Sequence, residues 1–168
     1  MSISMYTASV PVFRQVLGSL AAILEKAESH ADLKKIEPDA LLQARLYPDM
    51  FPLQRQVLVA AEFAQSVSAR LAGMEAPVPP EPAPGFAGLQ ERILQATEFV
   101  RGLAAVQFES SDTRSIVLRP GTPKEKHLTG QTYLFNYGLP QFFFHVTTAY
   151  AILRHNGVEI GKKDYMNL

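Results

Sequence analysis

Cysteine is absent from this chain of 168 residues. Its absence excludes disulfides, thiolate metal sites and cysteine nucleophiles. An excess of charge of one sign is also lacking, because 16 basic residues balance 16 acidic ones. Proteins that bind nucleic acid usually carry a basic excess that neutralises phosphates. We therefore expect no nucleic-acid partner.

Long hydrophobic runs are missing as well. The most apolar stretch, from Phe142 to Leu153, is interrupted by His145, Thr147 and Thr148. It is shorter and more polar than the roughly 20 apolar residues that span a membrane. The first residues do not combine a basic leader with an apolar run, as a signal peptide would. The expectation is a cytoplasmic protein without a membrane partner.

The sequence also lacks the short motifs that identify common reactions. It has no glycine-rich phosphate loop, no nucleophile elbow and no His-Glu-x-x-His pattern. The glycines of residues 85–88 follow no predicted strand, so they do not indicate nucleotide binding. The motifs therefore leave it undecided whether the protein is an enzyme.

Apolar residues recur at alternating steps of three and four, which places them on one face of a helix. The first such stripe consists of Val10, Phe13, Leu17, Leu20 and Leu24. Similar stripes predict helices over about 51–72, 86–106 and 130–156. Residues 29–49 are less regular and predict a connection with one or two helical turns. The five prolines of residues 77–84 predict a stiff, extended connection.

Two short segments, 115–118 and 126–128, predict a small hairpin between the third and fourth helices. For the fourth helix, Thr129 is the expected N-cap and Gly157 the residue after the C-terminal end, while Pro140 should bend it. Four helices with such stripes favour an all-α fold, a four-helix bundle formed by a single domain over residues 1–168.

The fourth helix is apolar nearly all round, and its polar residues Gln141, His145 and Thr148 share one stripe because they are four and three apart. Buried polar groups require hydrogen-bond partners. Three interpretations follow. His145 is a core histidine bonded within the bundle, the stripe lines a small-ligand pocket, or His145 binds a metal.

Three segments of the chain resemble a known family. They are LPQFFFHVTTAYAILRHNGV at residues 139–158, GKKDY at residues 161–165 and YPDMFPL at residues 47–53. Together they resemble an uncharacterised bacterial family of unknown function within the DinB/YfiT-like superfamily of putative metalloenzymes. The resemblance covers almost the whole chain.

This resemblance implies a DinB-like four-helix bundle that is often dimeric. Many members of the superfamily carry a metal site of three histidines, one from the second helix and two, four apart, from the last. In this sequence the corresponding positions are Gln56, Gln141 and His145. Only the last of them is a histidine.

Two functional hypotheses follow. The first is a noncatalytic or small-ligand-binding homodimer without a cofactor, whose core pocket is lined by Gln56, Gln141, His145 and Thr148. The alternative is a divergent metal-dependent hydrolase or thiol transferase, in which His145 binds a divalent zinc or nickel ion and glutamine or water completes the shell.

Overall fold

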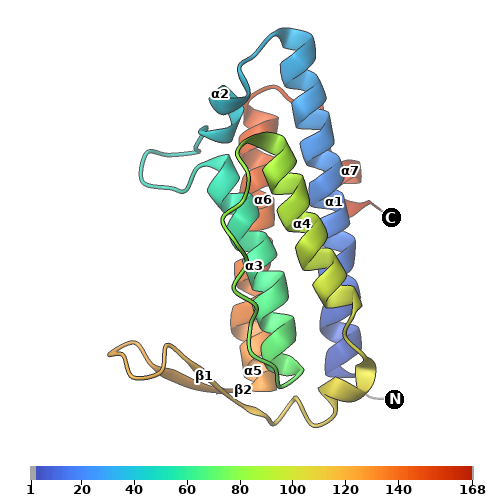
Figure 1. Ribbon diagram of the computed structural model, residues 1–168, viewed down its shortest axis with the longest axis vertical. Coiled ribbons are helices and arrows are strands. Elements are labelled where there is room, and N and C mark those ends of the chain that lie inside the picture. The colour runs from blue at the N-terminus through green and yellow to red at the C-terminus, as the bar shows by residue number, and fades with distance from the viewer. Residues whose placement is uncertain (1–2, 168) are drawn as a thin grey trace.

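The computed structural model describes residues 3–167 and is mostly helical (Figure 1). Within these residues, four long helical segments lie side by side. They are α1 (Met5–Lys34), α3 (Leu53–Leu71), α4 (Gly85–Arg101) and a last segment that runs from Gly130 to His155. Their apolar stripes meet in one core, in which Phe13, Leu17, Tyr133 and Phe142 are fully enclosed.

The first helix is longer than its apolar stripe predicted. It extends to Lys34 because the buried stripe continues through Ala27 and Ala31, and it ends where Lys35 adopts a left-handed conformation. By length and composition α1 could cross a membrane, but 50% of its most apolar window is buried in the structure, as in a core helix of a folded domain. The short helix α2 (Pro38–Leu42) follows.

The third long helix ends earlier than predicted. It stops at Arg101 rather than near Val106, and Gly102 caps it. Glycine is a poor helix former, so the chain leaves the helix there. A short 3₁₀ turn, η1 (Ala105–Phe108), comes next. Leu103 lies beyond the helix but is still buried, as its place in the stripe indicated.

Two strands, β1 (Ser115–Leu118) and β2 (Lys126–Thr129), pair antiparallel and project sideways from one end of the molecule (Figure 1). Thr129 then caps the last helical segment by accepting a hydrogen bond from the backbone N–H of Thr132. This segment begins as α5 (Gly130–Tyr133), widens into the π-helical turn η2 (Leu134–Gly138), and continues as α6 (Leu139–His155). A further short helix, α7 (Lys162–Met166), packs on α1.

The helices α3 and α4 run in the same direction, opposite to α1 and α6 (Figure 1). Residues 72–84 must therefore return along the full length of α3. An extended polyproline chain advances about 3.1 Å per residue against about 1.5 Å in a helix. The proline-rich connection can thus span α3 with fewer residues than the helix contains.

Candidate functional site

The polar stripe of α6 meets α3 at a single buried hydrogen bond. Nδ1 of His145 lies 2.7 Å from Oε1 of Gln56. Both side chains are buried, with 7% and 1% of their surface exposed. The helices α3 and α6 share the most extensive packing in the molecule. The pair therefore occupies a rigid part of the fold.

The hydrogen bonds of Gln56 determine the tautomer of His145. Nε2 of Gln56 donates to the backbone carbonyl of Phe51 at 3.1 Å. Its Oε1 must then face the imidazole, and as an acceptor it requires a proton on Nδ1 of His145. The neutral ring consequently carries its lone pair on Nε2. Within residues 3–167, Nε2 has no hydrogen-bond partner, and it is not fully enclosed by other atoms.

Three phenylalanine rings surround this imidazole. Phe63 and Phe51 stack on it at centroid distances of 5.8 Å and 6.4 Å, and Phe144 meets it edge-on at 5.2 Å. Phe51 and Phe144 are themselves 48% and 55% exposed. The site is therefore lined by aromatic rings, two of which are partly exposed at the surface.

The environment of His145 keeps it neutral. Burial lowers the pKa of its imidazole below the usual value, and the nearby positive charge of Arg55 lowers it further. Both effects disfavour the charged form. Near neutral pH, His145 thus presents a hydrogen-bond acceptor and not a cation.

The other two residues of the predicted stripe lie apart from this pair. Thr148 is buried, but its hydroxyl donates to the carbonyl of Phe144, one turn back in the same helix, at 2.7 Å. Gln141 is half-buried and lines a shallow hollow of about 360 Å³ with Tyr137 and Phe144. The structure brings Gln56 and His145 together, while Gln141 and Thr148 make no hydrogen bond with either of them within residues 3–167.

The side chains at this site do not fit a DinB-type zinc or nickel centre. Such a centre requires about three donors of the histidine, cysteine or carboxylate type. Two of the three positions are glutamines, and Oε1 of Gln56 is already bonded to His145. Nowhere in the described part of the chain do three His, Cys, Asp or Glu side chains gather in a metal-binding group.

The phenylalanines of the site were not identified from the sequence. Phe63 lies seven residues after Gln56, two helical turns further along α3, so the spacing places both on one face. Phe51 lies just before α3, in the segment at residues 47–53 that carries part of the family resemblance. That it stacks on a histidine 94 residues away is a property of the tertiary structure.

Comparisons with known proteins agree on one family. A family model described as a domain of unknown function, DUF1993, matches residues 5–166. The crystal structure of a DinB family member protein from Shewanella denitrificans is 40% identical in sequence and superposes with a TM-score of 0.90. That alignment covers 96% of this chain and 91% of the other. No curated protein matches the sequence significantly.

Proposed function

This chain belongs to the DUF1993 family and is DinB-like, and from that premise we propose that it binds a small molecule at His145 without catalysing a reaction. The observation that carries the proposal is the fixed tautomer of His145. Its Nδ1–H is held by Gln56, so Nε2 is left as an acceptor without a partner among residues 3–167, at the edge of an aromatic site.

The chemistry of the site indicates the kind of ligand. A neutral imidazole nitrogen accepts a hydrogen bond from an O–H or N–H group. The rings of Phe51 and Phe144 are exposed beside it and favour a flat apolar body. The proposed ligand is an uncharged planar molecule with one hydrogen-bond donor.

Phenol is a suitable probe for this site, because it combines an aromatic ring with one O–H donor. We expect a titration with phenol to shift the Nε2 resonance of His145 saturably in the NMR spectrum of the full chain. Toluene, which lacks the donor, should give a much smaller shift. An unchanged Nε2 resonance, or equal responses to both compounds, would contradict the proposal.

The alternative function is a metal-dependent hydrolase or thiol transferase with His145 as a zinc or nickel ligand. The measurement that separates the two is the metal content of protein purified without a histidine tag. We expect no stoichiometric zinc or nickel. Stoichiometric metal that is lost in the His145→Ala variant would favour the metalloenzyme.

We further propose that α1, α3, α4 and the last helical segment form a four-helix bundle of the DinB/YfiT-like type, as one domain over residues 1–168. The support is the shared core of the four segments and their similarity to the DinB family member. Circular dichroism and calorimetry of the full chain should show one cooperative unfolding transition.

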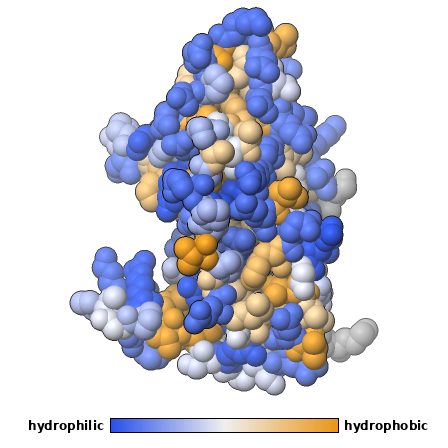
Figure 2. Space-filling model, viewed as in Figure 1, coloured by the Kyte–Doolittle hydropathy of each residue, from blue (hydrophilic) through white to orange (hydrophobic). Residues whose placement is uncertain are grey.

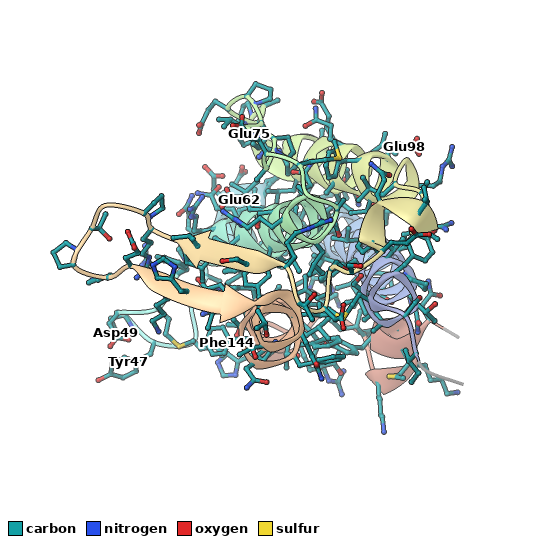
Figure 3. All side chains as sticks on the ribbon, turned by 90° about the horizontal axis from the view of Figure 1, so that it is seen from below. Tyr47, Asp49, Glu62, Glu75, Glu98 and Phe144 are labelled. Carbon is teal, nitrogen blue, oxygen red and sulfur yellow. The ribbon has the colours of Figure 1, made fainter. Side chains whose placement is uncertain are left out.

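We also propose that the protein is a homodimer that uses the aromatic surface beside His145. Tyr47, Phe51 and Phe144 are all exposed. Tyr47 and Phe144 lie toward the same edge of the molecule in the view along the helices (Figure 3). Exposed aromatic residues of this kind are enriched in protein interfaces. In a dimer, this surface would lie beside the His145 site.

A further inference from the structure

A second hollow lies on the opposite side of α3, where the proline-rich connection passes over the helix. It has a volume of about 400 Å³, within the size range of small-ligand sites. Its walls are α3, the extended residues 77–82 and Arg92 of α4. The connection is the thin segment that follows α3 back to the start of α4 in Figure 1, and hydrophilic side chains gather on the middle of this face in Figure 2.

Arg92 is the unusual residue of this hollow. Its side chain is buried, with 4% of its surface exposed, yet no carboxylate within the described residues lies close enough to form an ion pair with it. One guanidinium nitrogen, Nη2, donates to the backbone carbonyl of Pro80. A buried guanidinium without a counter-charge is costly unless a bound group compensates it.

The remaining nitrogens of Arg92 differ in how far they are enclosed. Nε is fully enclosed and has no partner within residues 3–167. A separate and much smaller cavity also borders Arg92. Its volume of about 30 Å³ is enough for one water molecule. Nη1 is likewise without a hydrogen-bond partner in the described chain, but it is not enclosed. It is therefore the guanidinium nitrogen that a ligand can reach.

Gln65 of α3 adds a second donor to the same hollow. It is 6% exposed, and its Oε1 is enclosed without a partner among residues 3–167. Its Nε2 also lacks a partner there, but it is not enclosed. Two buried side chains thus each present an N–H donor, one of them charged. A carboxylate has two acceptor oxygens that such a pair of donors can share.

From these contacts we propose that the hollow between α3 and the proline-rich connection binds a small monocarboxylate. One carboxylate oxygen accepts from Nη1 of Arg92 and the other from Nε2 of Gln65. The apolar part of the ligand lies against Leu58 and the proline rings, which offer no backbone N–H groups.

The other charges of the hollow set its selectivity. Arg55 and Glu62 also line it, but they pair with each other at 3.3 Å. Glu81 is exposed and forms no ion pair within residues 3–167. The carboxylate of Glu81 repels an anion of higher charge more strongly than an anion with a single charge. A monocarboxylate should therefore bind better than inorganic phosphate.

The test is a titration of the isotopically labelled full chain with benzoate, followed by NMR. We expect saturable shifts of the Gln65 side-chain amide and of the backbone around residues 58–66 and 77–82. Benzamide keeps the ring without the charge, so it loses the charge-assisted hydrogen bond. Inorganic phosphate has a higher negative charge and is repelled by the carboxylate at the opening. Both should bind at least about tenfold more weakly than benzoate.

Two variants separate ligand binding from a structural role of Arg92. Arg92→Lys keeps the charge but has one terminal nitrogen in place of two separated ones, so it loses the geometry that bonds Pro80 and the ligand from different atoms. Gln65→Leu removes a donor and also an enclosed, unpaired acceptor, so the fold should be at least as stable as before. We expect both to weaken benzoate binding at least about tenfold, and the exposed control Arg101→Lys to leave it unchanged.

The proposal fails if benzoate gives no saturable shift at these residues, or if benzamide and phosphate bind as well as benzoate. It also fails if the stable Gln65→Leu protein retains full affinity. In those cases Arg92 only attaches the proline-rich connection to α4 through the carbonyl of Pro80.

Discussion

At the scale of single residues, the pair of Gln56 and His145 determines what the site can do. The hydrogen bond from Gln56 to the Phe51 carbonyl orients the amide, the amide orients the imidazole, and the imidazole presents Nε2. Metal-binding histidines are oriented in the same way, because a neighbouring acceptor bonds their second ring nitrogen and fixes the tautomer. Here the hydrogen bond leaves a single acceptor, Nε2 of His145. The other two positions that correspond to the superfamily's three histidines are glutamines.

The first prediction concerns this orientation. Gln56→Leu removes the acceptor of a buried N–H group, so we expect a loss of about 1–3 kcal/mol in the free energy of unfolding. The nitrogen resonances of His145 should change from a single Nδ1–H tautomer to a mixture of both tautomers. Chemical denaturation and NMR measure the two effects. A variant with unchanged stability and an unchanged tautomer would show that Gln56 does not orient the ring.

A second prediction at this scale follows from the lowered pKa of His145. In the unfolded chain a histidine gains its proton near pH 6.5, at about the usual value, whereas in the folded protein it does so only at lower pH. The unfolded state then binds more protons, so stability is complete above about pH 6.5 and falls as the pH drops below it, by at most about 1.4 kcal/mol per pH unit.

Thermal unfolding between about pH 7.5 and pH 5 measures this slope. The variant His145→Gln should lose most of this slope, since the other groups with a shifted pKa titrate outside this range. Tyr133 is a phenol whose pKa is raised from 10.0. Glu125 and Asp164 are carboxyls whose pKa is lowered from 4.5 and 3.8. Their contribution to stability is lost only at more acidic pH. An equal slope in both proteins would contradict the assignment to His145.

At the scale of elements, the last helical segment shows how a proline is accommodated inside a helix. Pro140 has no N–H group, and its ring would collide with the carbonyl of the preceding turn. The chain widens just before it into the π-helical turn η2, in which the N–H of Leu139 donates to the carbonyl of Leu134, five residues back. The predicted bend is therefore a local change of helix type.

Within this turn, Gly138 allows the helix to approach α3. A Cβ atom at this position would lie 2.8 Å and 3.0 Å from the two methyl carbons of Val67. Val67 is fully buried and β-branched, so it has little freedom to move away. The close approach of α3 and the last segment, which holds Gln56 against His145, depends on the absence of a side chain here.

The third prediction follows from this contact. Gly138→Ala should lower the free energy of unfolding by about 1–3 kcal/mol, as expected for an overpacked core. The matched control is Gly18→Ala in α1, where no described atom outside the glycine's own stretch of helix lies within 4 Å of the added Cβ. Alanine is the better helix former, so this control should stabilise the protein by about 0.5–1 kcal/mol. Calorimetry measures the change in stability of both variants. Equal changes would exclude the Val67 contact as the cause of the loss in Gly138→Ala.

At the scale of the whole molecule, the connection between α3 and α4 determines the topology. Because these helices are parallel, the chain must return along α3, and the proline-rich segment does so without forming a helix or strand (Figure 1). Its passage creates the hollow in which Arg92 is buried. On another face, the segment at residues 43–52 carries the exposed Tyr47 and places Phe51 against His145.

The fourth prediction tests assembly at this face. Sedimentation at micromolar concentration should show a dimer for the wild-type chain and a monomer for Phe144→Asp, since a buried carboxylate opposes an apolar interface. Leu94→Asp places the same charge at an exposed leucine of α4 and should leave the dimer intact. A monomeric wild-type protein, or a dimer that tolerates Phe144→Asp, would rule out this interface.

The sequence alone determined the helical class and most of the element boundaries. The stripes of α3 and α4 have leucine, isoleucine or valine on both sides of their alanines, and caps such as Thr129 are local hydrogen bonds, so neither depends on distant residues. The prediction was weaker where small residues continue a stripe, as at Ala27 and Ala31, because alanine is apolar without being a distinctive core residue.

Only the tertiary structure decided which polar residues meet. Gln141, His145 and Thr148 are equivalent by helical spacing. Yet Thr148 donates to the carbonyl of Phe144 in its own helix, Gln141 is half-buried beside a shallow hollow, and only His145 reaches Gln56. Arg92 gave no signal in the sequence, since its burial depends on a connection that begins twenty residues earlier. Periodicity describes one helix face at a time, whereas hydrogen-bond partners and buried charges are set by the elements that pack against that face.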